Sequence, residues 1–333
     1  MKYFSLFFVT MFTLTNTSRS LAEPEVPAKP ETKEIRMHHF YKGLPVLVTG
    51  GCGFIGSHLC AKLVQLGARV TIIDDLSTGS QENITPIKDK VTLITKSVTD
   101  YQACLEATKE QKLVFHLAAF ISVPESIEKP RICYITNVDG TANVLEASKK
   151  NNVSRFIFSS SAAVYGLREG ICREDMPTAP LSPYGYSKFI GELYCQQYAQ
   201  NYGFQAVCMR YFNVYGPRQN PKGSYAAAVA KFTDQMMHNA PITIFGDGMQ
   251  TRDFVPVATI VDANLTLGMA PAEKVVGQVF NVGTGASITL LELIAQLKKK
   301  FPAYSGEIKF APARLGDVKY SAADCSKFFQ VCQ

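Results

Sequence analysis

Tyr184 and Lys188, in the stretch "SPYGYSKF", are residues whose types and spacing suggest chemistry. A separation of four residues places both side chains on one face of a helix. A tyrosine hydroxyl has a pKa near ~10 in water, so it is a poor base at neutral pH. A neighbouring ammonium group favours the phenolate and lowers that pKa, which lets the tyrosine accept a proton from a substrate. The same spacing also fits a packed tyrosine beside a solvated lysine, so the surrounding sequence must decide.

A glycine-rich stretch supplies such surroundings. In "VLVTGGCGFIGSHL", Gly50, Gly53 and Gly56 form G-x-x-G-x-x-G between an apolar run and a helical pattern. Glycine permits a tight turn and lets the backbone approach a pyrophosphate, whose charge rests on the helix N-terminus. Asp74 ends the next apolar run, near the ~20-residue distance at which a carboxylate binds ribose hydroxyls. The pattern predicts a dinucleotide site that favours NAD, because this carboxylate repels the 2′-phosphate of NADP. The alternative is a glycine-rich turn without a ligand.

The elements that must position these residues follow a regular order. From residue 44 onward, short apolar runs alternate with stretches of helical periodicity. This alternation predicts an α/β fold, a Rossmann-like doubly wound parallel sheet with a smaller C-terminal α/β lobe that binds the substrate. We expect the NAD-binding domain over residues 44–212 and the substrate-binding lobe over 213–333, with some segments of the lobe returning to the first domain.

Composition narrows the classes of partner. The chain has 333 residues, is 47% hydrophobic, and carries a net charge of +6 that is spread along the sequence. This balance argues against a nucleic-acid-binding arm but suits an anionic small substrate. Nine cysteines at irregular spacing include no C-x-x-C pair, which indicates reduced thiols and favours a cytoplasmic location. We expect no stable membrane association, no nucleic-acid partner and a homodimer.

The N-terminal segment disagrees with that location. Residues 1–22 read as a charged start, an apolar run and a small-residue cleavage site, the pattern of a secretory signal. The apolar run is too short to cross a membrane as a helix. An extension ahead of an internal start at Met37 fits equally well. We expect residues 1–40 to be a signal-like segment and linker outside the fold.

The chain resembles the extended short-chain dehydrogenase/reductase family, specifically the UDP-hexose 4-epimerases, and among these the enzymes acting on N-acetylated sugars. The resemblance covers Leu44 to Phe329. It rests on ordered motifs: "TGGCGFIGSHL", "HLAA", "NVDGT", "SSSAAVYG", "YGYSK", "RYFNVYGPRQNP", "GDGMQTRDFV" and "RLGDVKYSAAD". Two departures are Ser97, where relatives often carry an aspartate that meets the adenine, and the ending "SKFFQVCQ", which lacks the final helix of most relatives. We therefore expect weaker NAD binding and an incomplete C-terminal lobe.

The resemblance implies a set of site residues. The catalytic triad is Ser161, Tyr184 and Lys188, which also touch the cofactor or the substrate. The remaining cofactor positions match Gly50, Gly53, Phe54, Ile55, Gly56, Asp74, Ala118, Asn137 and Phe212. The nucleotide-sugar positions match Asn213, Arg252 and Arg314 at the diphosphate, Asp317 at the nucleotide ribose and Ser321 at the sugar. Arginine suits this role because its planar fork binds phosphate oxygens in pairs, although a single arginine is by default a solvated surface residue.

The implied reaction inverts C4 of a UDP-hexose. Hydride leaves C4 for the nicotinamide while Tyr184 takes the 4-hydroxyl proton, the 4-keto sugar rotates, and hydride returns to its other face. NAD is regenerated and behaves as a bound prosthetic group, with no metal required. Related dehydratases and decarboxylases place an acid after the strand-end serine, whereas this chain has Ala162 and Ala163 there. Alanine transfers no proton, so elimination and decarboxylation are disfavoured.

The substrate prediction depends on Ser321. Glucose-specific epimerases carry a bulky tyrosine at the aligned position, and a small residue leaves room for a 2-acetamido group. We therefore expect UDP-GlcNAc/UDP-GalNAc, with UDP-Glc/UDP-Gal as a second pair. UDP-glucuronate 4-epimerase, or another extended short-chain dehydrogenase acting on nucleotide sugars, is the alternative activity. A non-catalytic NAD-binding sensor is a further alternative, disfavoured because Tyr184 and Lys188 are both present.

Overall fold

A seven-stranded sheet organises the protein in the computed structural model, which describes residues 31–168, 170–221, 228–313 and 318–332. All of its neighbouring strands run parallel, in the order β11-β6-β5-β4-β1-β2-β3. The strands are β1 (Pro45–Thr49), β2 (Arg69–Ile73), β3 (Val91–Ile94), β4 (Leu113–His116), β5 (Arg155–Ser161), β6 (Ala206–Tyr211) and β11 (Val279–Val282). The strand order reverses at β1, which lies between β2 and β4. This arrangement confirms the predicted doubly wound α/β fold.

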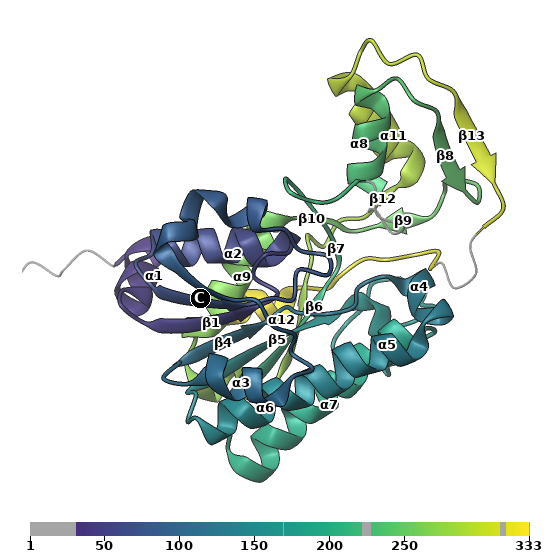
Figure 1. The fold of residues 1–333 in the computed structure, drawn as a ribbon. Helices are drawn as coiled ribbons and strands as arrows, with labels where there is room; N and C mark the ends of the chain where they lie inside the picture. Colours follow the sequence, from purple (N-terminus) through teal and green to yellow (C-terminus); the bar gives the residue numbers. More distant parts are fainter. Residues whose placement is uncertain (1–30, 169, 222–227, 314–317, 333) are drawn as a thin grey trace, which may run out of the picture.

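Helices cover both faces of this sheet (Figure 1). One layer holds α1 (Lys33–Tyr41), α2 (Phe54–Gln65) and α9 (Val257–Met269), and the other holds α3 (Tyr101–Thr108), α6 (Gly140–Lys150) and α7 (Pro183–Tyr202). Successive strand residues point to opposite faces, so Val46 and Val48 join the hydrophobic core of one layer while Leu47 joins the other. Burial on both faces explains why the strands read as continuous apolar runs.

Helix α1 corrects the expectation that the fold begins after residue 40. Thr32 caps this helix through its side chain, which accepts a hydrogen bond from the Ile35 backbone. Met37 and Tyr41 are buried, and the Tyr41 hydroxyl donates to the Leu265 carbonyl of α9 at 2.8 Å. Two apolar residues spaced by four within a charged stretch give too narrow a stripe to predict a packed helix. The linker therefore ends earlier than expected.

A smaller lobe lies to one side of the sheet (Figure 1). Its own core joins two helices to a pair of parallel strands: α8 (Ala228–Met237), α11 (Leu290–Lys300), β8 (Ile242–Phe245) and β13 (Ile308–Ala311). Two further pairs lie between lobe and sheet: β7 (Asn213–Tyr215) with β10 (Phe254–Pro256), and β9 (Thr251–Arg252) with β12 (Ile288–Thr289). These small sheets agree with the predicted C-terminal α/β lobe.

The chain end returns to the large sheet. β11 extends the sheet beyond β6, and α12 (Ser326–Cys332) packs against β11 with Phe328 buried. The stretch "SKFFQVCQ" therefore contains a helix that belongs to the large domain. The remaining short elements are α4 (Val123–Glu128), α5 (Pro130–Tyr134), α10 (Ala272–Val275), 3₁₀ turns at Gln81–Lys90 and Ala162–Val164, and a π-turn at Ile135–Asp139. Within the described ranges, no helix is both long and apolar enough to span a bilayer.

Candidate active site and cofactor pocket

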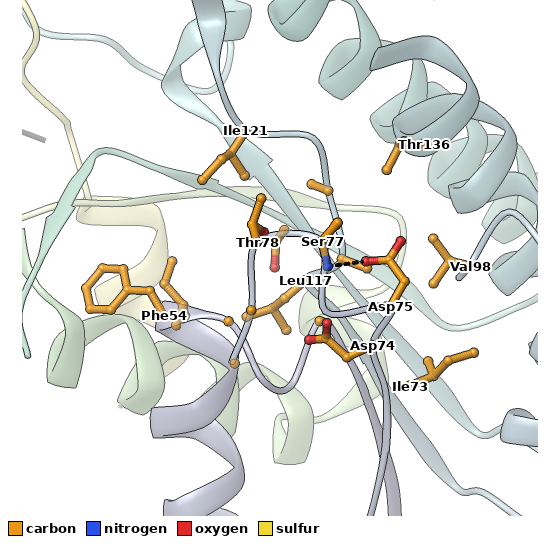
Figure 2. Close-up of a pocket in the computed structure, with 18 of the residues that line it drawn as sticks. Phe54, Ile73, Asp74, Asp75, Ser77, Thr78, Val98, Leu117, Ile121 and Thr136 are labelled. Atoms are coloured by element: carbon orange, nitrogen blue, oxygen red, sulfur yellow. Dashed lines mark hydrogen bonds between the residues drawn. The ribbon is translucent and has the colours of Figure 1, made fainter. Parts of the chain in front are cut away.

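A pocket opens at the carboxyl ends of the central strands, where the strand order reverses. In open α/β sheets this switch point is the usual ligand site. The pocket encloses about 970 Å³ of empty space, part of it open to solvent. Figure 2 shows side chains converging on it from the ends of several strands and from the start of α2. Nine residues expected from the sequence line it: Gly50, Gly53, Phe54, Ile55, Gly56, Asp74, Ala118, Tyr184 and Lys188.

The backbone of the glycine-rich turn packs too closely for side chains at two positions. Gly50 has a φ of +69°, and a Cβ atom there would lie 2.7 Å from the Ala118 nitrogen. A Cβ atom at Gly56 would lie 2.1 Å from the Gly50 carbonyl oxygen. Gly53 caps α2 with no side-chain hydrogen bond, so the first turn of this helix presents its backbone to the pocket. Glycine is therefore required at Gly50 and Gly56 by the packing of the turn itself, and the N-terminus of α2 that follows is where a dinucleotide pyrophosphate can bind.

Asp74 lies at the adenosine end expected for such a ligand. Its two carboxylate oxygens accept hydrogen bonds from the Cys52 nitrogen at 2.8 Å and the Leu76 nitrogen at 2.9 Å. Burial raises the pKa of Asp74, and these two backbone hydrogen bonds oppose that rise. Both bonds fix the orientation of the carboxylate at the pocket wall. The carboxylate is therefore held in one orientation where it lines the pocket.

The loop after β2 contributes lining residues that sequence reasoning missed. Asp75, Ser77 and Thr78 all line the pocket, and the Asp75 carboxylate accepts a hydrogen bond from the Ser77 nitrogen at 3.0 Å (Figure 2). Small polar residues directly after a strand, in "DDLSTG", are the signal that could have identified them. Lys96 and Val98 line the pocket on either side of Ser97, the residue noted as departing from the family.

Tyr184 and Lys188 project into the pocket from the start of α7. Ser182 begins this helix by accepting a hydrogen bond from the Gly185 nitrogen, with Pro183 in the first turn. The Lys188 ammonium is buried and donates to the Ser159 carbonyl at 2.8 Å. Burial lowers the pKa of Lys188 to about 8. The helical spacing read from the sequence thus brings a phenol and a weakly compensated cation to one cavity.

Ser161 occupies the last position of β5, where the strand passes into a 3₁₀ turn. Its hydroxyl accepts a hydrogen bond from the Ala163 nitrogen at 3.2 Å. The residues of this strand that line the cavity are Ser159 and Ser160. Ser160 donates to a carboxylate oxygen of buried Glu192 at 2.5 Å, so its hydroxyl is already engaged. The catalytic role of Ser161 stays a prediction.

Asn137 and Phe212 lie behind the lining rather than in it. Asn137 sits in the π-turn, accepts a hydrogen bond from the Phe120 nitrogen at 2.7 Å and donates to the Ser187 hydroxyl at 2.9 Å. Phe212 is buried after β6, with its ring centroid 6.4 Å from that of Tyr165. The side chain of Asn137 therefore holds a pocket segment in place.

The expected substrate residues gather where the lobe meets the sheet. Asn213 begins β7, and its amide donates to the Ser321 hydroxyl at 3.4 Å. Arg252 lies in β9, and the neighbouring Thr251 nitrogen donates to the Lys319 carbonyl at 2.9 Å, which brings the 318–321 segment alongside. Arg314 and Asp317 fall outside the residues that the structure describes.

Comparison with known proteins settles the family. The model of the NAD-dependent epimerase/dehydratase family matches residues 46–283. The chain belongs to this family. It is 40% identical over 285 residues to a putative UDP-glucose 4-epimerase of Methanocaldococcus jannaschii, covering 85% of this chain and 90% of that protein.

Solved structures of relatives share the same architecture. One is a UDP-N-acetylglucosamine 4-epimerase from Methanobrevibacter ruminantium, in complex with UDP-N-acetylmuramic acid. It has a TM-score of 0.82 and 38% identity, over 88% of this chain and 93% of that one. Another is a Thermus thermophilus UDP-glucose 4-epimerase in complex with NAD, with a TM-score of 0.80 and 34% identity over 86% and 92%. These likenesses confirm the expected NAD-dependent nucleotide-sugar epimerase and its class, an isomerase, with NAD as cofactor.

Proposed function

We propose that the protein inverts C4 of a UDP-hexose with NAD as a bound prosthetic group. The observation that carries the proposal is one pocket in which a glycine turn, Asp74, Tyr184 and Lys188 converge. Names of relatives support the reaction, since they are described as UDP-glucose and UDP-N-acetylglucosamine 4-epimerases. The pocket also argues against a non-catalytic NAD sensor, which would not need a phenol and a buried ammonium beside the cofactor cradle.

The proposed roles of the residues follow from their chemistry. Bound NAD supplies the acceptor and donor of the C4 hydride. Tyr184 takes the proton of the 4-hydroxyl and later returns it, because a phenolate is basic enough for an alcohol being oxidised. The Lys188 ammonium is fixed at the Ser159 carbonyl and favours the phenolate by its charge. Ser161 holds the substrate oxygen or relays its proton from the end of β5.

The cofactor is proposed to lie along the turn after β1. Gly50, Gly53, Phe54, Ile55 and Gly56 would hold the pyrophosphate, and Asp74 the adenosine ribose. Asp74 is within 2.9 Å of two backbone donors and remains at the wall, so it also repels a 2′-phosphate. Ala118, Asn137 and Phe212 would support the nicotinamide half.

The proposed substrates are UDP-GlcNAc and UDP-GalNAc, with UDP-Glc and UDP-Gal as a second pair. Asn213, Arg252, Arg314 and Asp317 would hold the nucleotide diphosphate. Ser321 supports the N-acetylated pair because it is small, buried and within 3.4 Å of the Asn213 amide. A tyrosine ring there would fill space that the acetamido group requires. UDP-glucuronate is the alternative substrate, because its epimerisation would use the same triad of Ser161, Tyr184 and Lys188.

Purified protein incubated with UDP-GlcNAc, UDP-Glc and UDP-glucuronate, followed by chromatography of the products, tests the proposal. We expect UDP-GalNAc from UDP-GlcNAc without added NAD or metal. If only UDP-glucuronate gave a 4-epimer, the proposed substrate would be wrong and the proposed reaction would stand. Absence of any 4-epimer from all three sugars would reject the reaction itself.

A homodimer and a cytoplasmic location complete the proposal. Helices α4, α5 and α7 pack together and expose large apolar side chains: Ile127, Ile132, Tyr186 and Leu193. Such a cluster favours association, and light scattering should give twice the chain mass of 36.6 kDa. All nine cysteines are free thiols, eight of them buried, which suits a reducing compartment. A mature protein beginning at Glu23 outside the cytoplasm would overturn the location.

A further inference from the structure

A buried hydrogen-bond chain runs behind the pocket, centred on the His116 ring at the end of β4. The His116 Nδ1 atom lies 2.7 Å from the Thr49 hydroxyl, and its Nε2 atom lies 3.0 Å from the Thr141 hydroxyl. All three side chains are at most 1% exposed. Thr49 immediately precedes the glycine turn, whereas Thr141 lies on α6, so the ring bridges two separate parts of the fold.

The direction of each hydrogen bond follows from the partners. The Thr141 hydroxyl donates its only proton to the Asn137 carbonyl at 2.6 Å, so it must accept from His116 Nε2–H. The Leu117 and Ala118 nitrogens donate to the Thr49 hydroxyl at 3.1 and 3.0 Å, which leaves its proton for Nδ1. His116 is therefore neutral, with its proton on Nε2.

The environment of the ring agrees with that protonation state. Burial and, to a smaller extent, the positive charge of nearby Lys188 together lower the pKa of His116 to about 3. The ring stacks on Phe158 at 6.0 Å between centroids. The neutral His116 ring therefore adds no second positive charge near Lys188.

The chain continues from Thr141 to the start of α7. The Asn137 side chain binds the Phe120 backbone on both its nitrogen and its oxygen, at 2.7 and 2.9 Å. It also donates to the Ser187 hydroxyl, which in turn donates to the Tyr184 carbonyl at 2.7 Å. Three lining segments thereby share one network: the turn after Thr49, residues 117–121 and the helix turn bearing Tyr184.

We infer that His116 is a positioning residue of the cofactor site, acting through Thr49 and Thr141. Its two hydrogen bonds fix the segment after β4 against the glycine turn and against the π-turn that supports α7. Affinity for NAD then depends on a ring that touches neither cofactor nor substrate. This inference rests on the proposed placement of NAD in the pocket.

Thr141→Val tests the inference, because it keeps the shape of the side chain and removes the acceptor of Nε2–H. Thr108→Val is a matched control. Thr108 is equally buried, donates to the carbonyl four residues earlier (Cys104, 2.8 Å) and accepts from the Asn151 amide (2.8 Å), but lies on α3 outside the pocket. Thr141→Ser keeps the hydroxyl and serves as the conservative variant.

NAD is stripped from each protein, and its dissociation constant and the melting temperature of the apo form are measured. We expect about tenfold weaker NAD binding for Thr141→Val, with Thr108→Val and Thr141→Ser within about twofold of wild type. Equal NAD affinity in the two valine variants, at similar melting temperatures, would overturn the inference. Failure of the wild-type protein to bind NAD at all would instead reject the proposed function.

A second measurement needs no substitution. Nitrogen-15 NMR of the wild-type histidine rings distinguishes the two neutral tautomers and the imidazolium. We expect the His116 signals of a neutral ring protonated on Nε2 at pH 7, with no change down to pH 5. A ring protonated on Nδ1, or charged at pH 7, would reverse the network and overturn the inference even if Thr141→Val failed to fold.

Discussion

We expect Lys188 to raise the rate of epimerisation and to lower the free energy of unfolding, and Lys188→Met separates these two effects. The ammonium is 4% exposed, and burial lowers its pKa from the ordinary 10.5 to about 8. One pKa unit corresponds to about 1.4 kcal/mol, so holding the charged form costs roughly 3 kcal/mol at pH 7. Methionine is apolar and similar in length, and it removes that cost.

The variant also loses the hydrogen bond to the Ser159 carbonyl at 2.8 Å. A hydrogen bond from a charged donor contributes about 1.5–3 kcal/mol, so a net gain in stability of about 1 kcal/mol is expected. Epimerisation should fall by about 10²–10⁴, because Lys188 supports the general base. A protein that is more stable and nearly inactive is therefore the expected outcome.

The pH dependence gives the sharper test. Between pH 8 and 10.5 the unfolded state binds more protons at Lys188 than the folded state, so this residue makes stability rise with pH. Below pH 8 both states are protonated and the cost is constant. The stability advantage of Lys188→Met should thus be full at pH 7 and disappear towards pH 10.5.

Thermal unfolding of the NAD-free proteins at pH 7, 8, 9 and 10 measures this difference. Lys150→Met, at an exposed position on α6, is the control for replacing a lysine by methionine. A Lys188→Met protein less stable than wild type at pH 7 by more than about 1 kcal/mol would contradict the proposed cost of the buried charge. A constant difference in stability between the two proteins across the pH series would contradict it as well.

Three further predictions concern the cofactor pocket and the neighbouring substrate residues. Tyr184→Phe should lower epimerisation by about 10²–10⁴ while NAD stays bound, and a rate within about tenfold of wild type in the chromatographic assay would remove its role as base. Asp74→Ala should weaken NAD binding and reduce the preference for NAD over NADP, as measured by fluorescence titration. An unchanged preference for NAD would mean that another residue selects the cofactor. Ser321→Tyr should lower turnover of UDP-GlcNAc by roughly 5- to 150-fold, the equivalent of ~1–3 kcal/mol of overpacking, and leave UDP-Glc nearly unchanged. Ser326→Tyr at the start of α12 is its control, and equal losses on both sugars would refute the selectivity argument.

Periodicity predicted the large sheet because its strands are buried on both faces. β1, β4 and β6 contain almost no exposed residue, so their apolar runs stand out from the helical stretches between them. The glycine turn was equally visible, since its spacing follows from a backbone that must leave space for a ligand. Tyr184 and Lys188 were found because one helix carries both.

Other features depend on partners far away in the sequence. The His116 network joins residues 67 and 25 positions apart, so neither hydrogen bond leaves a local pattern. β9 and β12 have two residues each, too few for any periodicity to be read. The lining loop after β2 escaped notice because small polar residues after a strand also mark ordinary turns.

Two buried cations near the end of β5, Arg210 and Lys188, differ in how their charges are compensated. Arg210 forms a close pair with Glu192, at 2.7 and 2.9 Å, and Ser160 donates to the same carboxylate. Burial would lower the pKa of Arg210, but the pairing with Glu192 raises it, so this cation is compensated and structural. The Lys188 ammonium instead donates to the neutral Ser159 carbonyl and lies 5.1 Å from the centroid of the Phe158 ring, and burial lowers its pKa. The weakly compensated charge of Lys188 lowers the stability of the apo protein. The same charge is, however, available to favour a phenolate at Tyr184. In the proposed mechanism the destabilised charge of Lys188 lies at the reacting end of the pocket, whereas the paired charge of Arg210 belongs to the supporting structure.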